Sequence, residues 1–324
     1  MNDACPKPDK ALVLTDGKAG HENQSRAFAR ALGIDPFLLP IRFKSPTAKA
    51  LSYVLDFFGI CTPTLFENLD VGTLPPEALG CKAILGTGSG TFYAVKTLSR
   101  RLGKPCGVVL YPRGYRLAGF NCILAPAFDR PDAAPNVIPV PANLVATDAA
   151  FYEAGVKAFR ERYVPSGRPV VAVIVGGPNK CSTLSADWMR SQLDRIFAEF
   201  RSDHEIWVTT SRRTPQDVEA VVDSFPFDYK LIYSRDHFNP IPAFVSLARV
   251  LYVTAESTGM LSEACTFGTA EVRALDNLNS GPHKFRRFID DLAAAGHLGG
   301  SRKIDLSSQF TRALELLKIK RPST

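Results

Sequence analysis

Residues 250–264 read VLYVTAESTGMLSEA and contain a complete strand-turn-helix unit. The apolar run at 250–253 predicts a short buried strand, and a Ser/Thr/Gly turn follows it. A helical pattern of apolar residues begins near Gly259. Because the first N–H groups of a helix have no partner inside that helix, a helix that starts here leaves them free at the end of the strand. The segment therefore predicts one unit of a parallel α/β sheet with an anion site at its turn.

The same unit recurs in both directions from this segment. In the second half of the chain, the pattern predicts strands at 170–175, 205–209, 230–232, 250–253 and 270–274, with helices at 187–200, 215–224, 240–248 and 259–267. In the first half, it predicts strands at 11–15, 36–39, 83–86, 107–110, 122–125 and 137–140, with helices at 22–32, 46–58, 90–102 and 146–163. A last helix is predicted at 307–319. Strands that alternate with helices indicate mostly parallel sheets covered on both faces.

Residues 164–169, VPSGRP, separate the two halves, because two prolines and a glycine interrupt the helical pattern there. A length of 324 residues also suits two domains. We predict Rossmann-like domains at 1–163 and 164–300, and a C-terminal helix at 301–324 that packs back on the first domain. The predicted fold class is α/β, with two parallel sheets that face each other across a cleft. In such sheets, ligands bind outside the carboxyl ends of the strands.

Composition limits the partners that we expect. The net charge of +7 is spread along the chain and suits anionic ligands, either nucleotide phosphates or a membrane surface. The alternative is a solvated basic surface without a dedicated partner. No nucleic-acid-binding signature is present.

Seven cysteines without a C-x-x-C pair favour reduced thiols and a cytoplasmic location. Residues 1–10 lack the apolar core of a signal peptide, and the apolar run at 50–60 is too short to span a bilayer.

Two loops in the first half carry candidate residues. Residues 15–24, TDGKAGHENQ, join the first strand to the first helix and offer a base, a phosphate clamp or an acceptor ligand. The candidates in this loop are Asp16, Gly17, Lys18, Gly20, His21 and Glu22, and the alternative is a helix cap with solvated charges. Residues 85–91, LGTGSGT, place Gly88 in a second strand-to-helix turn. Its glycines allow either close approach to a ligand or close packing of the strand on the helix.

Three loops in the second half could bind phosphate. Lys180 lies in 175–181, VGGPNKC, directly after the first strand of that half. Arg212 and Arg213 lie in 209–215, TTSRRTP, where arginine forks match phosphate oxygens. The alternative for these two is a solvated pair at a loop tip.

The third phosphate loop is the turn of the opening segment. Its candidate N–H groups belong to Ser257, Thr258, Gly259 and Met260. About one helical turn later, the carboxylate of Glu263 could accept hydrogen bonds from ribose hydroxyls. The alternative is that Ser257 caps the helix and Glu263 interacts with the helix dipole.

Histidine and cysteine positions show no metal-ligand spacing, so we expect neither a metal nor a cofactor. Of the five histidines, only His21 lies in a loop with other candidates. The others, His204, His237, His283 and His297, are scattered.

Four ordered segments resemble the mitochondrial fission ELM family, whose many bacterial members are described as glycosyltransferases of a GtrOC type. They are residues 16–24, 176–180, 210–215 and 253–265, and the resemblance extends from about residue 12 to about residue 288. It implies a GT-B fold with the acceptor side in the first domain and a sugar-nucleotide donor in the second. It also implies that Glu263 meets the donor ribose.

The sequence departs from this family at two places. The family usually has an aspartate where this chain has Glu256. It commonly has a Pro-Glu-His-Asp run where this chain has residues 126–129, PAFD, so the glutamate and the histidine are absent. Arg113, in 111–113, YPR, matches a family Asp-Pro-Arg run only in part.

The predicted function is metal-independent transfer of a sugar from a nucleotide-sugar donor to a cell-envelope glycan or a lipid-linked acceptor. Asp16 or His21 would then be the acceptor base or an orienting group. Two alternatives stay open: a non-enzymatic membrane-surface adaptor of the mitochondrial-fission type, and a sugar-nucleotide epimerase or hydrolase on the same fold. A peripheral position at the inner face of a membrane is compatible with either class.

Overall fold

A computed structural model describes residues 9–320, so most of the N-terminal segment that we expect not to be a signal peptide lies outside the described residues. The chain folds into two compact units. Unit 1 contains the chain up to Val140, Leu144–Ala146 and the chain from Leu306 onward. Unit 2 contains Pro141–Asn143 and Thr147–Asp305. The boundary that we predicted, between residues 163 and 164, assigns residues 147–163 to the first domain, whereas the structure has them in unit 2.

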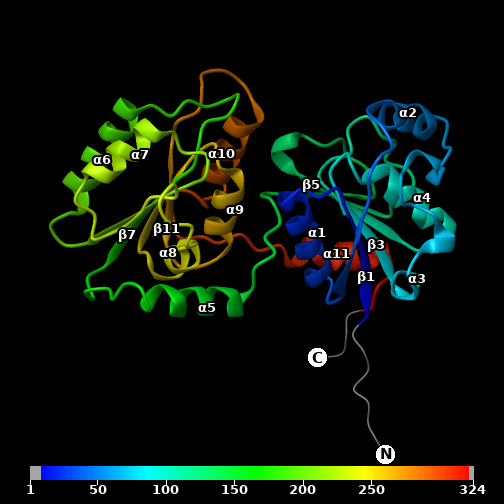
Figure 1. The fold of residues 1–324 in the computed structure, drawn as a ribbon, viewed down its shortest axis with the longest axis horizontal. Helices are drawn as coiled ribbons and strands as arrows, with labels where there is room; N and C mark the ends of the chain where they lie inside the picture. The colour runs from blue at the N-terminus through cyan, green and yellow to red at the C-terminus, as the bar shows by residue number, and fades with distance from the viewer. Residues whose placement is uncertain (1–8, 321–324) are drawn as a thin grey trace, which may run out of the picture. The chain divides into compact units, whose positions relative to one another are not determined.

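Unit 1 is built on a six-stranded parallel sheet with strand order β2-β1-β3-β4-β5-β6 (Figure 1). Its strands are β1 (Lys10–Thr15), β2 (Asp35–Pro40), β3 (Ala83–Thr87), β4 (Cys106–Val109), β5 (Cys122–Pro126) and β6 (Val137–Val140). Its helices are α1 (Ala19–Ala31), α2 (Pro46–Phe57), α3 (Pro76–Gly80), α4 (Phe92–Leu102) and α11 (Ser307–Leu317), with short 3₁₀ turns at Pro63–Leu65, Val71–Thr73 and Ala127–Asp129.

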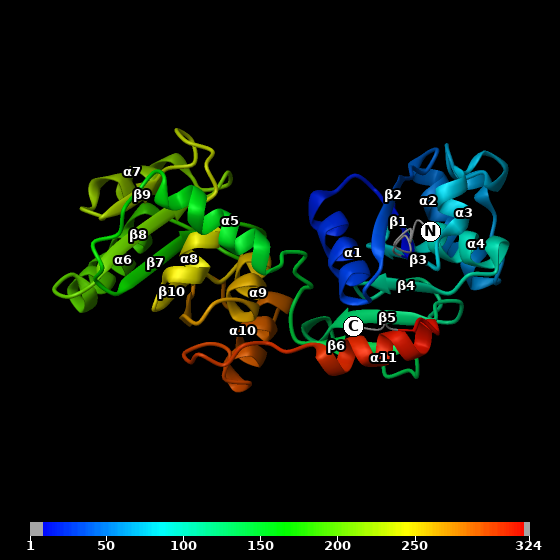
Figure 2. The same ribbon diagram turned by 90° about the horizontal axis from the view of Figure 1, so that it is seen from below.

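Alternate residues of the central strand β1 face two different helical layers. Leu12 and Leu14 pack in one apolar cluster with α3 and α4, whereas Ala11 and Val13 pack in another with α1 and α11. Because side chains alternate along a strand, a strand buried on both faces is continuously apolar. The helix α11 comes from the far end of the chain and packs on β5 and β6 (Figure 2).

Unit 2 is built on a five-stranded parallel sheet with strand order β11-β10-β7-β8-β9. Its strands are β7 (Val170–Val175), β8 (Glu205–Thr210), β9 (Tyr229–Leu231), β10 (Val250–Thr254) and β11 (Glu271–Leu275). Its helices are α5 (Ala149–Arg160), α6 (Ala186–Phe200), α7 (Gln216–Ser224), α8 (Ile241–Leu247), α9 (Thr258–Thr266) and α10 (Lys284–Ala294).

The two faces of this second sheet are also covered by helices. On one face, Val171 and Val173 pack with α6 and α7. On the other, the buried ring of Trp207 lies 4.9 Å from Phe159 of α5 and 5.7 Å from Phe244 of α8, measured between ring centroids. The two domains are thus Rossmann-like α/β layers, as the alternation of strands and helices predicts.

Side-chain caps start four of the described α-helices, which are α2, α5, α6 and α10. Asp148 accepts a hydrogen bond from the Phe151 N–H and starts α5 three residues later than predicted. The helices α3 and α10 were not predicted. In residues 9–320, no helix has both the length and the apolar composition that crossing a bilayer requires. The six cysteines in this range are free thiols, and four of them are buried.

Candidate functional site

The carboxyl ends of β7 and β10 are joined by one buried carboxylate, that of Glu256. Its Oε1 accepts hydrogen bonds from the Gly177 N–H at 2.8 Å and from the Thr254 hydroxyl at 3.1 Å. The same hydroxyl accepts from the Gly176 N–H at 2.8 Å. A Cβ at Gly176 would lie 2.0 Å from Glu256 Oε1, so only glycine allows this approach. The Gly-Gly loop after β7 is therefore fixed by the residue where the family usually has an aspartate.

The loop after β8 packs directly on this Gly-Gly loop. The Thr214 hydroxyl donates to the Gly176 carbonyl at 2.6 Å and accepts from the Ser211 N–H at 2.8 Å. A Cβ at Gly177 would lie 2.2 Å from the Arg213 carbonyl oxygen. Thr214 therefore ties the two loops together. This packing holds the backbone that carries Arg212 and Arg213, whose side chains are exposed.

A cavity of about 270 Å³ opens beside these arginines. Its walls come from the end of β8, the loop between β9 and α8, and the start of α9. Among its lining residues are Arg212, Arg213, Tyr233, His237 and Met260. The Tyr233 and His237 rings lie 4.6 Å apart, so the cavity combines an aromatic wall with two guanidinium groups. An anionic ligand with a planar ring fits this combination.

The predicted start of α9 is close to the observed one, and two of its N–H groups are free. The Ser257 N–H donates to Thr254 O and the Thr258 N–H to Glu256 O, while the Leu261 N–H makes the first bond within the helix. Within the described chain, the N–H groups of Gly259 and Met260 have no partner, and the Ser257 side chain does not cap the helix. The N-terminal end of α9 therefore presents free N–H groups and the positive end of the helix dipole to an anion.

Asn143, which was not among the predicted residues, holds the start of α9. Its side-chain amide donates to Thr258 Oγ1 at 3.2 Å, and its backbone N–H donates to Ser262 Oγ at 3.1 Å. Both bonds come from a segment outside the predicted second domain, which explains why no local pattern indicated them.

Glu263 lies one helical turn beyond Gly259 and Met260, as predicted, but it already has a partner. Its Oε1 accepts a hydrogen bond from the Tyr152 hydroxyl of α5 at 2.9 Å. Burial raises the pKa of the Glu263 carboxyl above its usual range, while the Tyr152 bond opposes that shift. A desolvated carboxylate gains from further hydroxyl donors, because each bond offsets part of its burial cost. Tyr152 was not predicted, because it lies in a helix rather than in a loop.

Lys180 is not brought to the cavity by any contact of the described chain. It lies exposed on a turn in which Asn179 and Ser182 form a bridge. Ser182 also forms a bridge with Leu278, which follows β11. The loop that carries Lys180 therefore packs toward β11, whereas Arg212 follows β8.

In unit 1, the first candidate loop forms an Asp–His pair. His21 Nδ1 lies 3.1 Å from both carboxylate oxygens of Asp16, and Lys18 Nζ lies 3.4 Å from Asp16 Oδ2. When Nδ1 carries the proton and donates to the carboxylate, Nε2 is left as the acceptor, which is the tautomer of a general base. Asp16 is thus positioned to orient His21.

The second candidate loop packs against this pair. A Cβ at Gly88 would lie 2.4 Å from His21 Cε1, and a Cβ at Gly90 would lie 2.6 Å from Asp16 Oδ2. Gly88 also has a φ of +81°, which favours glycine. The Asp16–His21 pair thus leaves no room for a Cβ at Gly88 or Gly90, whereas at Gly86 a Cβ would meet Thr91 and Val95 of the same turn and helix.

The remaining candidates of the first loop serve local structure. Glu22 accepts from the Arg26 guanidinium at 3.0 and 2.9 Å and from the Thr15 hydroxyl at 3.3 Å. Gly17 has a φ of +77°, and Gly20 faces open space. Glu22 therefore belongs to an ion pair at the start of α1.

Arg113 is joined to the segment in which this chain lacks the family's Glu and His. Its guanidinium donates to the Asp129 carbonyl and lies 5.4 Å from the Tyr111 ring centroid. The preceding Leu110 has a φ of +74°, which is strained for a leucine. Residues 111–113 and 126–129, the two segments that differ from the family pattern, thus contact each other through Arg113.

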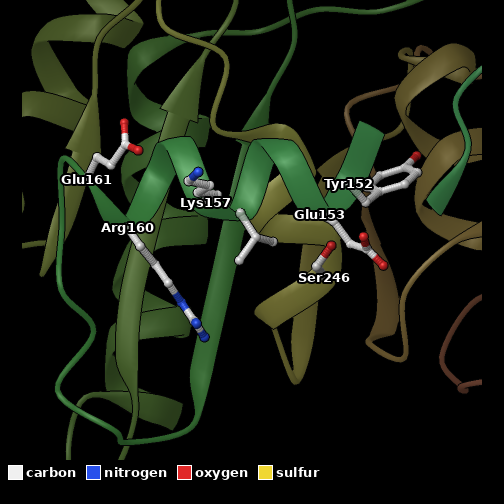
Figure 3. A pocket seen from close by; sticks show the side chains of 7 residues that line it. Tyr152, Glu153, Lys157, Arg160, Glu161 and Ser246 are labelled. Carbon is white, nitrogen blue, oxygen red and sulfur yellow. The ribbon is translucent and has the colours of Figure 1, made fainter. Parts of the chain in front are cut away.

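A larger hollow, of about 550 Å³, lies along α5 and not at a sheet edge (Figure 3). It is lined by Val156, Tyr152, Ser246 and charges of both signs, including Glu153 and Lys157, so it favours no single ligand charge. In residues 9–320, no three or more His, Cys, Asp or Glu side chains are grouped as a metal site would require.

Comparison with known proteins identifies relatives of this chain. The family model described as mitochondrial fission ELM1 matches residues 19–302. An uncharacterised protein of Rickettsia prowazekii is 29% identical over 164 residues, which cover 48% of this chain and 45% of that protein. Mitochondrial fission protein ELM1 of Arabidopsis thaliana is 26% identical over 123 residues, covering 37% and 29%. The matched region spans less than half the length of either relative.

Among solved structures, a protein of Listeria monocytogenes described as a UDP-N-acetylglucosamine 2-epimerase superposes with a TM-score of 0.50. The superposition covers 96% of this chain and 88% of that chain at 14% identity. At this identity the likeness concerns the fold, a GT-B-like pair of Rossmann-like domains.

Proposed function

This chain belongs to the mitochondrial fission ELM1 family, and from that premise we propose that it is a glycosyltransferase that uses a nucleotide-sugar donor. The sugar would pass to a glycan or a lipid-linked acceptor, without a metal ion. The observation that carries the proposal is the cavity that Arg212, Arg213 and Met260 share at the start of α9. The GT-B-like fold supports it, because ligands in such sheets bind at the carboxyl ends of the strands.

The proposal assigns groups of unit 2 to the diphosphate, the nucleobase and the ribose of the donor. The diphosphate would accept hydrogen bonds from the free N–H groups of Gly259 and Met260 and from Arg212. The nucleobase would stack beside Tyr233 and His237, whose rings line the same cavity. In this proposal the ribose hydroxyls meet Glu263, and Lys180 is an outer contact of the phosphates.

The Asp16–His21 pair would serve the acceptor. The acceptor oxygen forms a bond to the anomeric carbon of the sugar, and the bond from that carbon to the phosphate oxygen breaks. His21 Nε2 takes the proton of the acceptor hydroxyl, and the nucleoside diphosphate leaves with the bonding electron pair. Arg212 and the start of α9 stabilise the negative charge that develops on the leaving group.

A thermal-shift screen against UDP-, ADP-, GDP- and dTDP-sugars tests donor binding. A donor at a hundredfold its dissociation constant should stabilise the chain by about 2.7 kcal/mol. Arg212→Ala should weaken binding by about 1.5–3 kcal/mol in calorimetry, because a charged hydrogen bond to phosphate is lost. Glu263→Gln should also weaken binding while keeping an acceptor for the Tyr152 hydroxyl.

The matched control is Arg195→Ala, which removes an exposed arginine of α6 outside this cavity and should leave affinity unchanged. Unchanged binding in both Arg212→Ala and Glu263→Gln would contradict the donor site. If no sugar nucleotide stabilises the wild-type chain, the non-enzymatic adaptor becomes the better explanation. Product analysis with donor alone distinguishes a transferase from an epimerase, which converts the sugar without any acceptor.

A second prediction concerns His21. His21→Gln should lower the release of nucleoside diphosphate from the donor found in the screen by about 10²–10⁴-fold, because general-base catalysis is lost. Donor affinity should stay at the wild-type value, since His21 lies in unit 1 and the proposed donor groups lie in unit 2. Equal rates for variant and wild type would exclude His21 as the base.

A further inference from the structure

Exposed apolar side chains are concentrated in one segment of unit 1, residues 51–79. Eight large apolar residues are exposed in the described chain, and six of them belong to α2, the residues directly after it, and α3. These six are Leu51, Val54, Phe57, Phe58, Ile60 and Leu79. Phe57 and Phe58 are 72% and 69% exposed, and their rings meet edge to face at 5.3 Å. A monomeric protein rarely leaves such a patch without a partner.

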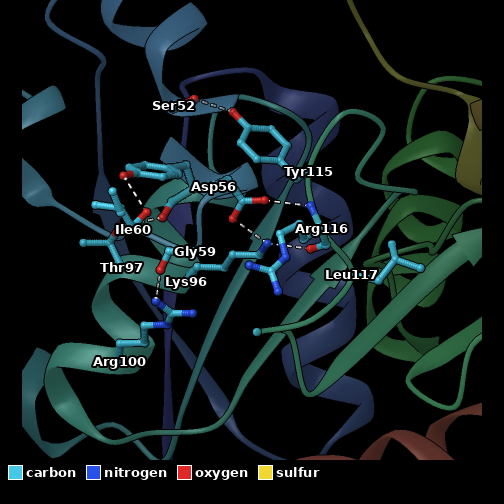
Figure 4. A network of polar contacts seen from close by, with 12 residues as sticks. Ser52, Asp56, Gly59, Ile60, Lys96, Thr97, Arg100, Tyr115, Arg116 and Leu117 are labelled. Carbon is cyan, nitrogen blue, oxygen red and sulfur yellow. Dashed lines mark hydrogen bonds and ion pairs between the residues drawn. The ribbon is translucent and has the colours of Figure 1, made fainter. Parts of the chain in front are cut away.

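Two arginines border this apolar patch at Gly59, between Phe58 and Ile60. Arg100 Nη1 donates to the Gly59 carbonyl at 2.5 Å, and a Cβ at Gly59 would lie 2.9 Å from Arg116 Nη1 (Figure 4). Asp56, three residues before Gly59, is buried and paired with Lys96. The border of the patch at Gly59 is therefore positively charged, while Glu77 of α3 is an exposed carboxylate near Leu79.

Arg100 also lines a hollow of about 700 Å³. The charged residues around this hollow are Lys82, Arg100, Lys104, Lys318 and Lys320, against the single carboxylate of Asp9. Lys104 Nζ donates to the Leu79 carbonyl, which joins the hollow to the α3 end of the patch. Apolar patch and cationic hollow are thus continuous through Arg100 and Lys104.

We propose that this continuous surface docks on an anionic lipid bilayer. The aromatic and aliphatic side chains of the patch would enter the headgroup–acyl boundary, and the lysines and arginines of the hollow would contact lipid phosphates. The charge pattern favours a bilayer over a second copy of this chain, because two identical cationic surfaces repel each other. The proposal does not depend on the transferase activity.

Co-sedimentation with vesicles tests it, using phosphatidylcholine alone and phosphatidylcholine mixed with phosphatidylglycerol, without any nucleotide. The wild-type chain should bind the anionic vesicles. The double variant Phe57→Ser/Phe58→Ser should lose about tenfold or more of that binding, because each substitution removes apolar area from the interface. Lys318→Gln/Lys320→Gln should weaken binding to the anionic vesicles only.

The matched control is Val164→Ser, since Val164 is 82% exposed but lies in unit 2, and it should bind as the wild type does. Thermal melts should show that the serine variant is folded, because both rings are exposed. Raising the salt concentration gives a second readout on unaltered protein, and binding should fall with it. Equal binding to neutral and anionic vesicles, no binding by the wild type, or full binding by the serine variant would each overturn the proposal. So would a wild-type dimer that this variant converts to a monomer.

Discussion

At the residue scale, buried carboxylates hold the loops that carry the candidate residues. One oxygen of Glu256 receives two hydrogen bonds, and its Oε2 is buried without a partner in the part of the chain that the structure describes. A buried acceptor without a donor is costly, so this carboxylate is kept for the bonds of its other oxygen. Glu256 is therefore a support of the Gly-Gly loop at the carboxyl edge of the sheet.

A second buried carboxylate supports the surface proposed for lipid binding. Asp56 and Lys96, 4% and 2% exposed at their side chains, form an ion pair at 2.6 Å. Asp56 also accepts from the Arg116 N–H at 2.7 Å, and Lys96 donates to the Arg116 carbonyl (Figure 4). Desolvation lowers the pKa of Lys96, and the Asp56 carboxylate opposes that shift. The pair thus fixes Arg116 beside Gly59.

Removing one partner of this pair should be costly. Asp56→Ala should lower the free energy of unfolding by about 3–5 kcal/mol, because Lys96 is left buried and unpaired. The double variant Asp56→Ala/Lys96→Met should recover part of this loss in denaturant unfolding. A double-mutant cycle in which the two effects simply add would show that the pair is not coupled.

At the element scale, two helices pack on residues that lie far from them in sequence. The helix α5 directly follows unit 1 in the chain, yet Phe159 packs among Trp207, Tyr229 and Phe244 of unit 2. The helix α11 follows unit 2, yet Leu314 and Leu317 pack in the apolar cluster of β1, β3 and β5 in unit 1. The helix α11 therefore stabilises a core from which the whole of unit 2 separates it in sequence.

Leu317→Ala should test the role of α11. The residue is fully buried, so the cavity should cost about 2–5 kcal/mol. Amide exchange should accelerate in β5 and β6, on which α11 packs, and less in β7 and β8. Glu315→Ala on the same helix removes only a surface ion pair with Arg312 and should cost less than about 1 kcal/mol. An equal effect of both changes would contradict a packing role.

At the scale of the whole molecule, local patterns were sufficient for the order of the elements. Continuous apolar runs such as 170–175 and 250–253 predict strands buried on both faces, and the alternation with helices predicts parallel sheets. Both sheets are parallel in every pairing observed. The helix α10 was not predicted, although its pattern is amphipathic.

The candidate site could be predicted only where it follows the strand ends. Because the carboxyl ends of parallel strands lie on one edge, the loops with Asp16, Arg212 and Gly259 were found from the pattern alone. His237 and Tyr152 were not found. His237 was set aside as one of several scattered histidines, although it follows β9, and Tyr152 lies on a helix whose partner sheet was assigned wrongly by sequence order.

The sequence by itself determined the two parallel α/β layers and the loops that end their strands, because both follow from periodicities of neighbouring residues. Only the tertiary structure decided that α5 covers the second sheet, and that Gly176, Gly177 and Gly88 each pack against a candidate side chain or loop. The physical reason is that the sequence of an apolar helix face does not specify which apolar surface that face will cover. The presence of a glycine likewise does not show which neighbouring group would clash with a Cβ at that position.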